Sequence, residues 1–165
     1  MTKMISKYHH SAVIIIWIVI GIQQVLSPNY LLQAGTPVTT QSFISPEQGC
    51  NWAGVAGQVF DENGSPVNGL VVELHGQYLE QEISIATTTG SSQQMGVGGF
   101  DLQLSDHPIN TQAVFYIQLV DASGAPLSQK TYFNTTDACD QNLVIINFFD
   151  FGPHFDNYLP IINHS

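Results

Sequence analysis

The sequence predicts an all-β protein, a β-sandwich of seven short strands preceded by an N-terminal hydrophobic leader helix. Three observations support this fold class. From residue 50 to about residue 151 apolar and polar residues alternate, and no helical period persists. Gly, Pro, Asp and Asn separate the alternating runs, as expected of turns. The longest uninterrupted apolar run lies near the N-terminus, at residues 12–22.

The N-terminal run, AVIIIWIVIGI, has eleven residues and no charge, and it follows a polar segment with Lys3 and Lys7. This is the length of the apolar region of a signal peptide, whereas a spanning helix needs about 20 residues. Residues 1–34 are therefore either a signal peptide cleaved near Ala34 or an uncleaved membrane anchor. In both cases the lysines keep the N-terminus in the cytoplasm. We expect the rest of the chain to be extracellular or at the cell surface.

Composition divides the remaining chain into three parts. Residues 35–49 are rich in Thr, Ser, Gly, Gln and Pro, which is typical of a linker. Residues 50–151 carry the predicted sandwich. Residues 152–165 form a tail that begins with a Gly-Pro pair and contains the apolar segment YLPII. This segment is expected either to contact a partner or to fold back as an additional edge strand.

Seven segments carry the strand pattern: 52–60, 69–75, 82–89, 96–104, 112–121, 128–134 and 142–150. Seven short strands in about 100 residues are typical of a β-sandwich. The last segment is apolar on both faces, which indicates a central or covered strand.

One turn occurs twice, in VFDENGSPV and LVDASGAPL. The shared Asp can accept a hydrogen bond from a later backbone N–H, the Gly adopts positive φ, and the Pro restarts an extended chain. A calcium loop using Asp61, Glu62 and Asn63 would lack the further carboxylates that such a site requires. We interpret both segments as structural turns. Asn63, Asn134 and Asn163 begin N-glycosylation sequons, a short pattern that also occurs by chance.

Cys50 and Cys139 are the only cysteines. In an exported chain they predict one disulfide, closing a loop of about 90 residues. A free thiol or a metal pair is the alternative, although no His or further Cys lies nearby at ligand spacing. In Ig-like and transthyretin-like sandwiches the first and last strands can run side by side in parallel. The two cysteines, each just before one of these strands, would then meet at one end of the sandwich.

The charge distribution excludes several partners. All thirteen acids lie at or beyond Glu47, and after the leader only Lys130 opposes them, which leaves a formal charge of −12. Such a surface repels phosphate backbones, so nucleic acid is excluded as a partner. Peripheral binding to anionic lipid is excluded for the same reason. Membrane contact is expected only through the N-terminal segment, if that segment is not cleaved.

The stretch CNWAGVAGQVFDENGSPVNGLVVELHG resembles the opening of a carboxypeptidase regulatory-like domain, whose pattern is G-x-V-x-D-x-x-G-x-P-V-x-G-x-x-V-x-L. The later segments GGFDLQLSDHPINTQAVFYIQLVDASGAPL and TTDACDQNLVIINF resemble bacterial secreted proteins that carry this module. The resemblance covers residues 50 to about 151. It implies a seven-stranded transthyretin-like sandwich, in a superfamily that also holds starch-binding domains, and no catalytic residue is carried over with it.

The sequence offers little for catalysis or metal binding. Nucleophilic catalysis requires a Ser or Cys beside a His and a carboxylate. Asp106-His107 is the one adjacent pair, in a predicted loop, and His75 lies at a strand end. A metal site from His154, Asp156 and His164 would lack a rigid frame. We therefore expect no catalytic residue, no metal and no cofactor.

One candidate ligand site depends on strand register. If the hairpin around Gly124 is symmetric, Phe115 faces Phe133 on the core side, and Tyr116 faces Tyr132 on the outer side. Gln118 and Lys130 would flank the tyrosines, and the four residues could stack on and hydrogen-bond a sugar. The alternative is a cross-strand aromatic pair that only stabilises the sheet, and a shift of one residue would separate the tyrosines.

These observations predict a non-enzymatic extracellular or cell-surface module for protein interaction, adhesion or structural display. The alternative is a carbohydrate-binding module that uses the exposed aromatic face. The expected partner is accordingly an extracellular protein or a glycan.

Overall fold

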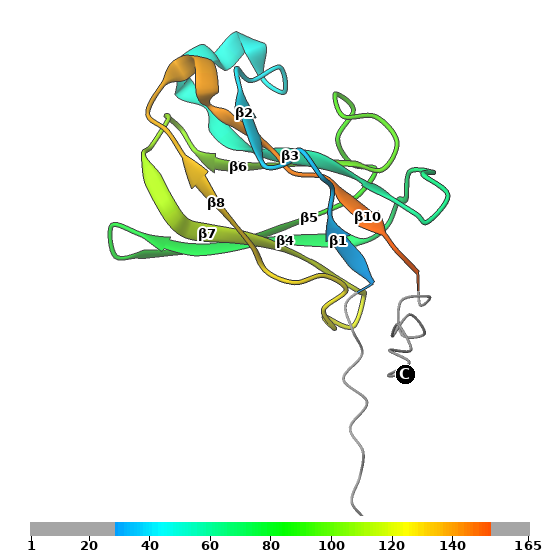
Figure 1. Ribbon diagram of the computed structural model, residues 1–165. Coiled ribbons are helices and arrows are strands. Elements are labelled where there is room, and N and C mark those ends of the chain that lie inside the picture. The colour runs from blue at the N-terminus through cyan, green and yellow to red at the C-terminus, as the bar shows by residue number, and fades with distance from the viewer. Residues whose placement is uncertain (1–28, 153–165) are drawn as a thin grey trace, which may run out of the picture.

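The computed structural model describes residues 29–152 and shows an all-β sandwich of two facing sheets (Figure 1). Its strands are β1 (Tyr30–Leu32), β2 (Val38–Thr40), β3 (Ala53–Phe60), β4 (Val71–Tyr78), β5 (Gln81–Thr88), β6 (Gly99–Ser105), β7 (Thr111–Val120), β8 (Thr131–Thr135), β9 (Leu143–Ile145) and β10 (Phe148–Asp150). The predicted all-β sandwich is confirmed at this level.

One sheet has four antiparallel strands in the order β5-β4-β7-β8. In the other sheet β3 pairs with β6 on one side and, in parallel, with both β9 and β10 on the other. β9 and β10 in turn pair with β2 and β1, which run antiparallel to them. The first long strand and the last strands of the chain are therefore parallel neighbours, as predicted.

Residues 29–152 contain ten strands, where the sequence predicted seven. Each predicted segment contains a strand, but the last one divides into β9 and β10. β1 and β2 lie within residues that we assigned to the leader and the linker. Each has only three residues, too few for an alternating pattern to stand out.

The break between β9 and β10 is organised by Asn147. Its Oδ1 accepts a hydrogen bond from the Gln58 N–H at 2.9 Å, and its main-chain oxygen accepts one from the Gln33 N–H at 2.8 Å. Its Nδ2 donates to the Gln33 Oε1 at 2.9 Å. The Asn147 side chain thus makes the hydrogen bonds that backbone pairing would otherwise supply at the break between β9 and β10.

Cys50 and Cys139 form the predicted disulfide, with their Cα atoms 5.1 Å apart. They lie on two short 3₁₀ helices, η1 (Pro46–Asn51) and η2 (Cys139–Gln141), directly before β3 and β9. Because β3 and β9 are parallel neighbours, the bridge joins the starts of both strands at one end of the sandwich.

The stretch expected to be a linker packs against this end. The Asn142 Oδ1 accepts a hydrogen bond from the Ser42 N–H at 2.7 Å, and its Nδ2 donates to the carbonyl oxygens of Gly49 and Trp52. Ile44 is buried in a small cluster with Trp52, Ala56 and Leu143. Residues 35–49 therefore belong to the folded unit, together with β1 before them.

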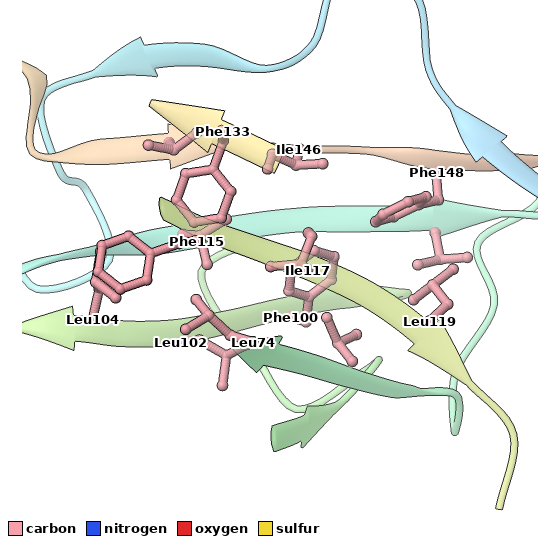
Figure 2. Close-up of a cluster of buried hydrophobic side chains, with 14 of the residues drawn as sticks. Leu74, Phe100, Leu102, Leu104, Phe115, Ile117, Leu119, Phe133, Ile146 and Phe148 are labelled. Atoms are coloured by element: carbon pink, nitrogen blue, oxygen red, sulfur yellow. The ribbon is translucent and has the colours of Figure 1, made fainter. Parts of the chain in front are cut away.

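The main core fills the space between the two sheets (Figure 2). Its fully buried side chains come from strands of both sheets and include Leu74, Phe100, Phe115, Ile117, Leu119 and Phe148. Full burial of one such side chain stabilises the fold by about 1.5–3 kcal/mol.

The predicted leader helix and the YLPII segment lie outside the described residues. Between residues 29 and 152 the structure contains no helix that is long and apolar enough to cross a membrane.

Candidate functional site

The outer face of the four-stranded sheet carries the predicted tyrosine pair. Phe115 pairs with Phe133 and Tyr116 with Tyr132, as the symmetric hairpin predicts. On the next strand, His75 pairs with Tyr116. His75, Tyr116 and Tyr132 thus form an aromatic row across β4, β7 and β8.

The three rings of the aromatic row contact one another. The centroids of His75 and Tyr116 lie 5.3 Å apart with nearly parallel planes, and those of Tyr116 and Tyr132 lie 5.3 Å apart with tilted planes. The Lys130 Nζ lies 4.4 Å from the Tyr116 centroid, in a cation–π contact. Tyr116 is half-buried among these neighbours, whereas Tyr132 remains 53% exposed. Tyr132 therefore offers a ligand the larger free aromatic surface.

Polar groups surround the row. The His75 Nε2 lies 3.1 Å from the Glu73 Oε2, and the Gln118 Nε2 donates to the Ser128 carbonyl oxygen at 2.9 Å. Hydrogen bonding to Tyr116 raises the pKa of Lys130, which is therefore a cation at neutral pH. Lys130 is the one lysine or arginine between residues 29 and 152. The structure brings together the four predicted residues, but Gln118 is already engaged with the protein.

A groove of about 530 Å³ lies beside Tyr132, where the edge strands β8 and β2 of the two sheets face each other. We call this groove and its two edge strands the open side. Its lining contains no charged residue: Pro37, Val38, Thr39, Tyr132, Phe133, Asn134 and Val144. Val38 is 49% exposed. The edge strands present backbone N–H and C=O groups that an added strand can pair with.

Sequence reasoning missed two contributors to these surfaces. His75 was expected only at a strand end, although its alternation with Val72 and Leu74 already places it on the outer face. Placing it beside Tyr116 requires knowing that β4 pairs with β7. Val38 was assigned to the linker, because β2 is too short to show a period.

Both repeated turns have the expected geometry. The Asp61 Oδ1 accepts hydrogen bonds from the N–H groups of Asn63 and Ser65, at 2.9 and 2.8 Å. The Asp121 Oδ1 accepts those of Ser123 and Ala125, and also the Ser123 hydroxyl at 2.6 Å. These bonds, led by that of the hydroxyl, lower the pKa of Asp121. The carboxylates are thus engaged in holding the turns.

The Asp106-His107 pair lies in an exposed loop. The His107 Nδ1 is 2.6 Å from the Asp106 Oδ1, and this hydrogen bond lowers the pKa of the carboxyl group. The Ser105 hydroxyl accepts a hydrogen bond from the main-chain N–H of His107 rather than from its ring. The arrangement is that of a loop stabilised by neighbouring side chains.

No family model matches the chain, and neither the curated proteins nor the solved structures contain a match to it. The likeness to carboxypeptidase regulatory-like domains stays a prediction from the motif.

Proposed function

We propose that this chain is an exported, non-enzymatic β-sandwich module that binds a protein partner at the cell surface, in an adhesive or display role. The observation that carries the proposal is the open side. It combines a groove without charged residues and two edge strands, with Val38 and Tyr132 exposed beside them. An extended segment of a partner can pair with an edge strand and place alternate side chains in the groove.

Two features support export. Structural disulfides such as Cys50–Cys139 form and persist in oxidising compartments. The apolar run at residues 12–22 has the length of the apolar region of a signal peptide. The partner segment is expected to be neutral or basic, because residues 29–152 carry twelve acids and Lys130 alone opposes them.

The test is selection of extended peptides from a displayed library on the full chain, followed by binding measurements on variants. Val38→Lys places a charge at the groove without disturbing the core. We expect it to weaken the binding of the selected peptides about tenfold or more. Leu79→Lys is the matched control, because Leu79 is 78% exposed at the turn between β4 and β5. Equal binding by wild type and Val38→Lys would refute the open side as the binding surface.

Carbohydrate recognition is a second candidate, favoured by the exposure of Tyr132 next to Lys130 and Tyr116. An exposed tyrosine beside hydrogen-bond donors is suited to stacking on a sugar ring. A glycan array probed with wild type and with Lys130→Gln tests this candidate, since Lys130 lies outside the groove. Loss of a glycan signal in Lys130→Gln, with retention in Val38→Lys, would favour the aromatic row over the open side.

A further inference from the structure

A second exposed apolar surface lies on the outer face of the other sheet. Register places Leu31 of β1 beside Phe149 of β10, and Phe149 beside Phe60 of β3. Phe151 contacts this row, with its ring centroid 5.2 Å from that of Phe149. We call these four residues the apolar strip.

The strip faces outward because its neighbours in the chain face inward. Val59 and Phe148 are fully buried in the core, one position before Phe60 and Phe149. Leu31 is 43% exposed and Phe151 is 41% exposed, while Phe60 and Phe149 are half-buried. Three aromatic rings and a leucine at the surface of an acidic domain indicate a contact surface.

The strip lies where the described chain begins and ends. The Phe151 N–H donates a hydrogen bond to the Asn29 carbonyl oxygen at 3.1 Å, so both ends of the described chain lie at the ends of β1 and β10, beside the strip (Figure 1). The apolar run ends at Ile22, seven residues before Asn29. Seven residues span at most about 25 Å, so a run held in a bilayer keeps the strip near the same membrane.

We propose that the apolar strip rests on a zwitterionic phospholipid surface while the run at residues 12–22 is inserted in the bilayer. The inference rests on the export part of the proposed function, in its anchored form. Phe and Leu side chains on the surface of a protein can bury themselves at the boundary between headgroups and acyl chains. Asp61 and Asp150 directly follow Phe60 and Phe149 in the sequence, which disfavours anionic lipid. The domain would then stand with its sandwich directly on the membrane.

The experiment uses the full chain in phosphatidylcholine nanodiscs, with and without brominated acyl chains, which quench tryptophan on contact. Trp17→Phe removes the fluorophore of the apolar run, and buried Trp52 remains as an internal reference. Leu31→Trp then places a probe in the strip, and Leu79→Trp places a matched probe at the exposed β4–β5 turn.

We expect bromination to remove roughly half of the Leu31→Trp emission, because an interfacial ring lies close to the upper acyl chains. The Leu79→Trp emission should not change. Equal quenching of the two probes, or none at either, would overturn the proposal. So would a Leu31→Trp probe that is shielded from aqueous iodide yet unquenched by lipid, since the strip would then be covered by the chain's own tail or a second copy.

Flotation of the full chain with phosphatidylcholine vesicles is measured first. A chain that stays in the aqueous fraction would overturn the anchored form, and with it this inference, without bearing on peptide binding at the open side. A chain that floats but shows no lipid contact at Leu31→Trp would overturn only the proposed contact between the apolar strip and the lipid.

Discussion

Among the glycines in the described part of the chain, Gly57 leaves the least room for a side chain. A Cβ atom added there would lie 1.7 Å from the Ile146 carbonyl oxygen and 2.9 Å from the Phe100 ring. The Ile146 N–H in turn donates to the Ala56 carbonyl oxygen at 2.9 Å. A side chain at position 57 would therefore push apart β3 and the segment between β9 and β10.

We expect Gly57→Ala to lower the free energy of unfolding by about 3 kcal/mol or more, because the Ile146 backbone and the Phe100 ring both have to move. Gly124→Ala is the control. Gly124 has a φ of 83° and open space around it, so its substitution should cost only about 1 kcal/mol of backbone strain. Urea unfolding measures both variants. Equal losses would show that crowding at Gly57 is not the dominant effect.

A second residue-scale prediction concerns acid stability at the Asp121 turn. The pKa of Asp121 is lowered in the folded state, so the carboxylate contributes stability that is complete above its unfolded pKa. That contribution is lost as the pH falls through the folded pKa. We expect Asp121→Asn to reduce stability at pH 7 and to reduce it less in strong acid. Unfolding curves between pH 7 and pH 2 measure the difference, and a pH-independent effect would contradict this account.

Among the elements, β1 joins the two sheets. It pairs with β10 in one sheet, and it bridges to Ser128, at the entry to β8 of the other. Tyr30 is 9% exposed and belongs to the main core, and its N–H donates to the Leu127 carbonyl oxygen at 3.0 Å. Cleavage of a leader near Ala34 would remove these contacts of β1.

We expect Tyr30→Ala to destabilise the full chain by about 3 kcal/mol, through loss of a buried aromatic side chain. Leu31→Ala, one position along the same strand and largely exposed, should cost less than about 1 kcal/mol. Thermal or denaturant unfolding compares the two variants. Similar effects would mean that β1 does not contribute to the core as described.

The elements also show how far sequence reasoning reaches. Strands with five or more residues were predictable, because alternation such as Phe100-Asp101-Leu102 repeats often enough to stand out. The Tyr116–Tyr132 register followed from the symmetry of the turn at Gly124, which is local in sequence. The place of β1 and β2, and that of His75 beside Tyr116, depends on pairing between distant segments. A three-residue strand is too short for its sequence to indicate which distant segment it pairs with.

At the scale of the whole molecule, the disulfide closes the largest covalent loop, with a sequence separation of 89 residues. The disulfide stabilises the fold by restricting the conformations of the unfolded chain, because β3 and β9 already lie side by side in the folded state. Both cysteines are exposed, so reductant has access to the bridge.

We expect reduction, or the Cys50→Ser/Cys139→Ser double variant, to lower stability by about 4 kcal/mol, since loop closure would no longer restrict the unfolded state. Denaturant unfolding with and without reductant measures this loss. The double variant is the control for reductant itself, because it should not respond to reductant. A reduced protein as stable as the oxidised one would show that the bridge adds little to the packing.

The pairing of β1 and β2 with β10 and β9 has a consequence for synthesis. If the chain is exported during synthesis, residues 30–40 cross the membrane more than a hundred residues before their partner strands. The early segment has nothing to pair with until the last strands arrive, and long-range pairing of this kind forms slowly. In an exported chain, completion of the sandwich would therefore be tied to the end of translocation. A ribosome or translocon that stalls before residue 150 would hold a domain with an unfinished side, open to quality-control proteases.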